Sequence, residues 1–193
     1  FSLKQAKINE FGTYDWFNPS YTLNARYSII DGFGLVGEYV GVRQRPNLQD
    51  FAGPFMPKMD AINVNMVRAG IYWNNPWIEL TSQFTYIGQT NFKYRDQFTN
   101  PNDASETVIL PIVYDVATLG WTTDLVLTPF EGFSFHGLFT YQEPKYKNFS
   151  FQPVFSDGAG QKYYFNDSNV IGMSKVIVEL DPSYQIDRWR FWM

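Results

Sequence analysis

His136 is the residue of this sequence best suited to acid–base or metal chemistry, because imidazole titrates near neutral pH and binds many metals. It is the only histidine, and the chain contains no cysteine. No second histidine can join it in a metal site, and no serine is identified as its nucleophilic partner. The sequence therefore predicts no catalytic, metal-binding or cofactor-binding residue. In the β-barrel that the pattern described below predicts, His136 is interpreted as an ordinary residue that faces the lumen or packs in the wall.

Carboxylates form the second candidate for chemistry, because a pair of them can perform general acid–base catalysis. The acids that fall inside expected strands are Glu38, Glu79, Asp124, Glu179 and Asp181. Three basic residues, Arg26, Arg68 and Lys175, are expected on the same face. Mixed charges on one face more simply describe the lining of a water-filled or plugged lumen. We therefore predict that the protein is not an enzyme.

The segment 131–142, EGFSFHGLFTYQ, shows how such a face arises. Successive side chains of a strand point to opposite faces, so Phe133, Phe135, Phe139 and Tyr141 share one face while His136 lies on the other. The same sorting recurs in the expected strands 19–30, 77–88, 117–128 and 174–186. In all four, charges occur only on the polar face. This is the pattern of a transmembrane β-barrel, with lipid outside and water inside.

Composition agrees with a barrel. Aromatic residues make up 19% of the chain, which fits aromatic girdles at two membrane interfaces. No run approaches the roughly 18 apolar residues that a spanning helix requires. The net charge of -4 is not segregated into blocks, so no nucleic-acid partner is predicted.

Turn spacing gives the topology. The remaining strands are expected at 34–43, 62–73 and 133–142, with another that begins at Trp189. Tight turns are expected near residues 31–33, 74–76, 129–132 and 186–188, and they alternate with long connections at 44–61, 89–116 and 143–173. Short periplasmic turns and long extracellular loops alternate in this way in outer-membrane barrels. Pro182 lacks a ladder donor and is expected at a bulge or at the rim of its strand.

Two long connections carry aromatic and cationic groups that could meet a ligand. Segment 43–60 contains Arg43, Arg45 and Lys58 beside Phe51, Phe55 and Met56, and segment 89–116 contains Asn91, Lys93, Tyr94, Arg95 and Asp96. Ordinary solvated loops are the simpler interpretation. The substrate-binding residues are left unassigned.

Several segments resemble the barrel of TonB-dependent outer-membrane receptors. The most specific is the aromatic strand that ends in Tyr141-Gln142-Glu143-Pro144-Lys145-Tyr146. Similar stretches are 5–19, 43–46, 119–124 and 178–184. That family has a plugged barrel of about 22 strands. The resemblance therefore implies that residues 1–193 are a single segment of about seven or eight strands from the late part of such a barrel, with the plug outside this chain.

The same resemblance implies a function and partners. The parent protein would be an active nutrient transporter of the Gram-negative bacterial outer membrane, and this segment would supply wall and extracellular ligand loops. Its partners would be outer-membrane lipid and, through the missing plug, the TonB energy-coupling complex. A surface lipoprotein is a further partner that the resemblance leaves open.

Three alternatives remain at this stage. The chain could be a complete eight-stranded outer-membrane protein with a structural or adhesion role, since its length fits. It could be an outer-membrane enzyme acting on lipid, for which activity lost on His136→Ala would be the sign. A soluble lipocalin-like carrier is the third, but its surface should be more charged than 18% charged residues allow.

Overall fold

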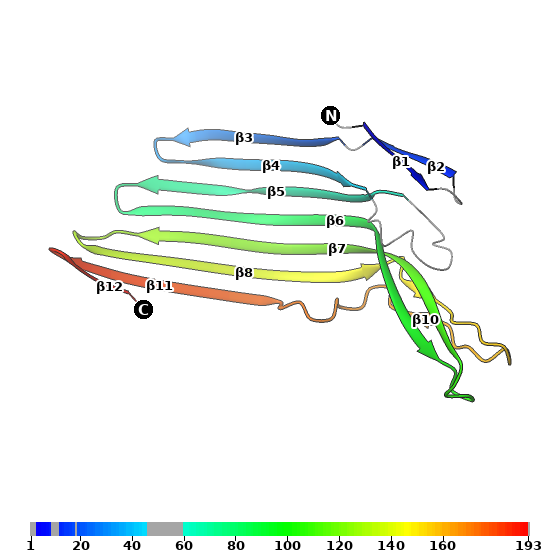
Figure 1. Cartoon of the computed structure of the whole chain (residues 1–193). Coiled ribbons are helices and arrows are strands. Elements are labelled where there is room, and N and C mark those ends of the chain that lie inside the picture. Colours follow the sequence, from blue (N-terminus) through cyan, green and yellow to red (C-terminus); the bar gives the residue numbers. More distant parts are fainter. Residues whose placement is uncertain (1–2, 9–11, 18, 46–59, 193) are drawn as a thin grey trace.

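The computed structural model describes residues 3–8, 12–17, 19–45 and 60–192. None of these residues belongs to a helix long and apolar enough to cross a membrane. The main element is an antiparallel sheet of eight strands (Figure 1). Its strands are β3 (Ser20–Ile30), β4 (Phe33–Gln44), β5 (Ile62–Asn75), β6 (Ile78–Thr99), β7 (Thr107–Leu127), β8 (Phe133–Lys147), β11 (Val176–Ile186) and β12 (Trp189–Trp192).

Each strand of this sheet pairs with its neighbours along the chain, in the order β12-β11-β8-β7-β6-β5-β4-β3. Two small hairpins lie outside it: β1 (Leu3–Ile8) with β2 (Gly12–Phe17), and β9 (Ser150–Phe151) with β10 (Tyr163–Tyr164). In the described residues β3 and β12 do not pair, so the sheet is an open wall. The expected all-β antiparallel fold is confirmed, and the open sheet is consistent with a part of a barrel.

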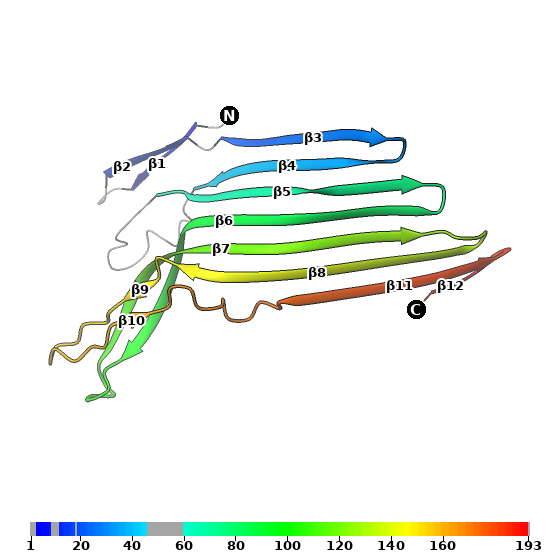
Figure 2. The same cartoon turned by 180° about the vertical axis from the view of Figure 1, so that it is seen from behind.

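Short turns gather at one end of the sheet and long connections at the other (Figures 1 and 2). Neighbouring turns are tied together, because the backbone N–H of Asn74 donates to the carbonyl of Gly32 at 2.7 Å. Gly32 has φ +72°, and a Cβ at this position would lie 2.2 Å from the carbonyl oxygen of Asn74, so only glycine fits. The expected alternation of short and long connections is therefore confirmed.

The prediction of a loop over 89–116 is wrong in part. Strands β6 and β7 continue to Thr99 and from Thr107, so they extend well beyond the other strands (Figure 1). The pairing register between β6 and β7 shifts between Gln89 and Phe92. Asn91, inside this irregular stretch, has φ 63°. Beyond it, Phe92 pairs with Tyr114 and Phe98 with Val108. Cross-strand apolar pairs of this kind stabilise the extension although its alternate positions are polar.

Two smaller expectations also change. The connection 143–173 begins later, because β8 continues to Lys147, and it contains the β9–β10 hairpin. Pro182 causes no register shift and pairs with Phe135. Strand β12 ends opposite Ser183, so Pro182 lies just beyond the part of β11 that β12 covers, where a missing N–H is tolerated.

The register places most of the large apolar residues on one face, which we call the apolar face, although Val36, Val40 and Met66 lie on the other. One row across it is Ala25, Gly37, Ala69, Phe84, Trp121, Tyr141 and Val176, each opposite the next on the neighbouring strand. The large side chains of this row are exposed, and the exposed fractions of Phe84 and Val176 are 45% and 53%. Such exposure of apolar side chains over many strands indicates that something apolar covers them.

Two hydroxyl side chains interrupt the apolar face. Ser82 and Thr123 are directly opposite on β6 and β7, and their oxygens are 2.7 Å apart. The indole N–H of Trp121 donates to Thr123 Oγ1 at 3.1 Å. The polar atoms are therefore satisfied within the sheet, which is what a surface without water requires.

Gly70 of β5 tests how closely two backbones must approach. A Cβ at this position would lie 2.0 Å from the carbonyl oxygen of Ser82 on β6, whereas a Cβ at Gly37 would lie 3.8 Å from the Arg68 carbonyl oxygen. We expect Gly70→Ala to lower the free energy of unfolding of the intact protein by about 1–3 kcal/mol, as overpacking does. Gly37→Ala is the matched control and should change little. Equal urea midpoints for both variants in detergent would contradict the close approach.

Phe84 and Gln83 test the assignment of the faces, because they are neighbours on β6 with opposite orientation. If lipid covers the apolar face, Phe84→Arg should cost about 2–4 kcal/mol near the membrane midplane. Gln83→Arg should cost much less. The measurement is equilibrium folding of the intact protein into lipid vesicles, and a larger loss for Gln83→Arg would reverse the assignment.

Candidate functional site

The polar face of the sheet holds the charges that the sequence places there. The Arg68 guanidinium lies 3.2 Å from the Glu38 carboxylate on the neighbouring strand. Arg26 lies 3.6 Å above the ring of Tyr72, whose hydroxyl is 2.7 Å from Ser28 Oγ. These contacts join three strands across the face, so the expected interior lining is a network of paired groups.

His136 lies between two acids of the polar face. Its Nε2 is 3.1 Å from Asp124 Oδ1, and its Nδ1 is 3.5 Å from Asp181 Oδ2. Each ring nitrogen therefore faces a different carboxylate, an arrangement that does not direct the three groups at one metal ion. Among the described residues no group of three histidine and acidic side chains could hold a metal. The absence of catalysis at His136 stays a prediction.

The remaining acids do not form a catalytic pair with each other. Glu79 is opposite Asn74 and Val126, and Glu179 is opposite Leu138. Lys175 precedes β11, and its carbonyl accepts a hydrogen bond from the Gln142 N–H. The structure thus separates Glu79 from Glu179, which lie on strands β6 and β11 that are not neighbours in the sheet.

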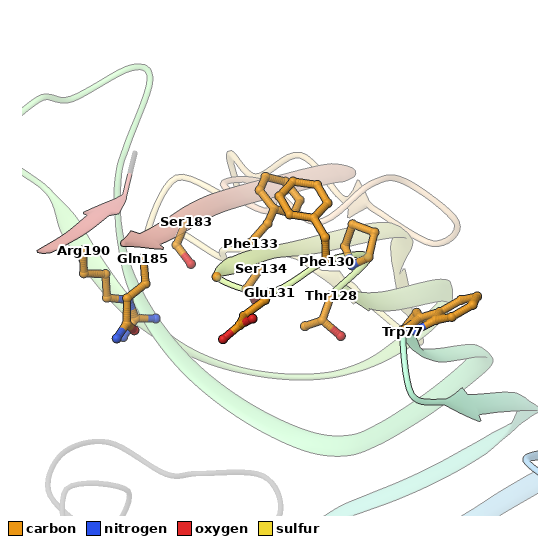
Figure 3. A pocket seen from close by; sticks show the side chains of 11 residues that line it. Trp77, Thr128, Phe130, Glu131, Phe133, Ser134, Ser183, Gln185 and Arg190 are labelled. Atoms are coloured by element: carbon orange, nitrogen blue, oxygen red, sulfur yellow. The ribbon is translucent and has the colours of Figure 1, made fainter. Parts of the chain in front are cut away.

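A hollow of about 490 Å³ lies at the short-turn end. Figure 3 shows that the rings of Phe130 and Phe133 lie together and point away from Glu131 and Arg190. The centroids of the two rings are 5.1 Å apart. The hollow is therefore the polar-face mouth of the wall at this end. Trp77 lies at its edge and is 65% exposed.

The long-connection end holds an aromatic cluster that the sequence reasoning missed. It joins the extension of β6 and β7 to the segment after β8, which lies beside that extension in both views (Figures 1 and 2). The centroids of Phe149 and Tyr114 are 4.8 Å apart, and those of Phe149 and Phe165 are 4.9 Å apart. Phe98 contacts Phe151 at 5.1 Å. Alternating aromatics at 149, 151, 163 and 165 were the available signal.

The cluster encloses a pocket of about 290 Å³, which we call the aromatic pocket. Its lining residues are Tyr94, Asp96, Ile112, Tyr114, Tyr146, Phe149, Phe151, Phe165 and Ile171. Ile112 is 3% exposed and forms its floor, whereas Tyr94 is 51% exposed at its rim. Burial raises the pKa of the Tyr114 hydroxyl, so this side chain stays a neutral donor. A mostly apolar concavity with a few polar groups is the usual form of a small-molecule site.

The tips of the two long connections are joined by hydrogen bonds, which we call the loop clasp. Glu106 accepts from Asn100 Nδ2 at 2.6 Å and from the Ser156 backbone N–H at 2.8 Å. Asn102 donates to Asp157 at 3.0 Å. Donation from Asn100, then from Ser156, lowers the pKa of Glu106, and donation from Asn102 lowers that of Asp157. The clasp therefore holds the walls of the aromatic pocket together across the loops.

Most of segment 43–60 lies outside the described residues, including Phe51, Phe55, Met56 and Lys58. Arg43 donates from Nε to Asn63 at 2.9 Å. The polar residues of 89–116 hold the base of the extension: Asn91 Nδ2 donates to the Ala61 carbonyl, and Lys93 donates to that of Asp60. Of the candidates in this segment, Tyr94 and Asp96 line the aromatic pocket.

No family model matches the sequence, and no curated protein matches it significantly. Solved structures do match. The ferric-catecholate import receptor Fiu from E. coli K12 has a TM-score of 0.60 at 16% identity, over 92% of this chain and 23% of that one. The copper transporter OprC has a TM-score of 0.64 at 12% identity, over 97% and 29%. The FrpB iron transporter from Neisseria meningitidis has a TM-score of 0.58 at 9% identity, over 95% and 27%.

These three structures are TonB-dependent receptors with β-barrels. The chain thus has the fold of a wall segment from a barrel of that class, and the expected likeness is confirmed at the level of fold. It spans 23% to 29% of the length of these structures.

The loop clasp predicts a pH dependence. The folded pKa of Glu106 lies below its ordinary value of 4.5, so its stabilising effect is present above that value and is lost as the pH falls through the lowered pKa. Glu106→Gln has one acceptor oxygen for two donors, and it should increase amide exchange at Ser156 at pH 7. The increase should vanish at an acidic pH below that lowered pKa, where the wild type is protonated too. Protection factors from hydrogen exchange measure this.

Glu131→Gln, in a turn at the opposite end of the sheet, is the control for this prediction. It should leave exchange at Ser156 unchanged at either pH. Unchanged protection in Glu106→Gln at pH 7 would show that the clasp does not hold the loops.

Proposed function

We propose that this chain is a wall segment of a TonB-dependent active transporter of the bacterial outer membrane, and that its long connections form part of the extracellular ligand site. The observation that carries the proposal is the sorting of the sheet. One face carries exposed Leu, Phe, Trp and Tyr side chains on successive strands, and the other carries paired charges. A bilayer on one side and water or a plug on the other would satisfy both faces.

The structural matches support the same function. Their names describe an import receptor for ferric catecholate, a copper transporter and an iron transporter. By this likeness the parent protein takes up a scarce nutrient, with energy from the TonB complex delivered through a plug. Outer-membrane lipid would cover the apolar face. A surface lipoprotein over the long connections is compatible with this proposal.

The long connections support a ligand role on physical grounds. The extension of β6 and β7 and the β9–β10 hairpin lie side by side beyond the end of the other strands (Figure 2). Their residues line the aromatic pocket, and the loop clasp joins their tips. In the proposed orientation that end faces the outside of the cell. A rigid scaffold that presents pocket-bearing loops is the usual way in which binding sites are placed.

A complete small barrel is the second candidate, because the sheet has eight strands and eight can close around a side-chain-filled interior. In the described residues, however, the edges formed by β3 and β12 are not paired with each other. Unpaired edges cannot face lipid, since their backbone groups would lack partners. Further strands beyond β3 and β12 would supply those partners in the transporter.

The size of the intact protein tests the proposal. Because the chain covers under a third of each structural match, we expect an outer-membrane protein several times larger than 22.5 kDa, with a plug encoded upstream. The measurements are mass spectrometry of the intact protein in the outer-membrane fraction and sequencing of the complete reading frame that encodes the chain.

The residue 1–193 chain by itself is the control. Without its remaining strands it should show no heat-modifiable migration after refolding in detergent. A mature product of 22.5 kDa that refolds into a heat-modifiable barrel would favour the small barrel and overturn the transporter.

A further inference from the structure

The aromatic pocket has walls that are fixed before any ligand arrives. Phe149 lies at the centre of the ring cluster, 4.8 Å from Tyr114, 4.8 Å from Tyr146 and 4.9 Å from Phe165. The Tyr114–Tyr146 pair is edge-to-face at 5.5 Å. Rings that already contact one another lose little freedom on binding, so their surfaces form a preorganised site.

The charge of the lining is one-sided. Of the lining residues, Asp96 alone bears a formal charge. Its Oδ1 accepts a hydrogen bond from the Gln97 backbone N–H at 2.9 Å, which orients the carboxylate, and Oδ2 supplies further acceptor capacity. Ring faces carry negative partial charge and attract cations. An anionic group would meet both the rings and the carboxylate.

Nearby basic side chains are directed elsewhere. Lys93 and Arg95 alternate with Tyr94 and Asp96 along β6 and so lie on its other face. Lys147 forms an ion pair with Asp167, and Lys162 lies 4.8 Å from the ring of Tyr164. The negative character of the pocket is therefore not cancelled by these cations.

The pocket volume limits what can enter. About 290 Å³ is at the lower end of ordinary ligand sites, which begin at about 300 Å³. One ring-sized group with a short substituent fits this space. A larger ligand would place one such group here and contact other loops with the rest.

We propose that the aromatic pocket binds an organic cation, meaning an apolar or aromatic body that carries a protonated amine, with the amine at Asp96 and the body among Tyr114, Tyr146 and Phe149. The pocket's role in uptake rests on the proposed function, but binding itself does not. Among the matched structures, Fiu is named for a ferric catecholate, and this pocket selects a ligand group of positive charge instead.

Three probes with one aromatic body test the charge preference: phenethylamine, 2-phenylethanol and 3-phenylpropanoate. They are titrated by calorimetry into the intact protein in detergent at pH 7. We expect the cation to bind about tenfold more tightly than the alcohol, and the carboxylate to bind more weakly still. Equal affinities, tighter binding of the carboxylate, or no binding of phenethylamine would overturn the inference.

Variants separate the charge from the rings. Asp96→Asn keeps the shape of the side chain. It should lower the affinity for phenethylamine about tenfold and leave the affinity for 2-phenylethanol unchanged. Phe149→Ala should weaken both probes. Val154→Ala, at a residue 69% exposed outside the pocket, is the control and should change neither. Unchanged affinity for phenethylamine in Asp96→Asn would remove the carboxylate from the site.

The two proposals fail in different ways. An outer-membrane protein of receptor size that does not bind phenethylamine would overturn the organic-cation site alone. A 22.5 kDa product that binds phenethylamine through Asp96 would overturn the transporter and leave the site intact.

Discussion

The structure depends on one constraint: each strand must present apolar side chains to one face and polar side chains to the other, at a period of two. This sorting makes the apolar rows continuous across the sheet and brings charges together on the opposite side, as Arg68 with Glu38 and His136 with Asp124. Two polar exceptions on the apolar face, Ser82 and Thr123, obey the same constraint because they satisfy each other. A bilayer is the environment that such a wall fits.

Where β6 and β7 extend beyond the other strands, the polar-face side of the two strands carries mostly apolar side chains instead of polar ones. Among them are Phe92, Tyr94, Phe98 and Tyr114, and a second long connection covers this side with its own aromatic residues. Part of the structure's apolar surface is thus buried by loop on strand instead of by the proposed lipid. Hydrogen bonds of the loop clasp join the tips, so the aromatic pocket is built from parts far apart in the sequence.

Sequence reasoning located the sheet strands well because alternation and turn residues are local signals. It placed the turns at Asp31–Phe33 and Pro129–Gly132 and put His136 and Asp124 on one face. It failed over 89–116, where Asn91, Lys93 and Arg95 suggested a solvated loop. Those polar residues occupy alternate positions of a long hairpin, and the apolar positions between them are stabilised by partners on β7 and in the segment after β8.

The sequence alone determined that the elements are β-strands, which residues share each face of the sheet, and that short and long connections alternate. Each of these features follows from residues within a few positions of one another. The tertiary structure decided the aromatic pocket and the bridging position of His136. Both depend on register between strands and on the docking of residues 149–165 against the extension of β6 and β7. Such contacts join residues that are distant along the chain, and no local periodicity encodes which of them will meet.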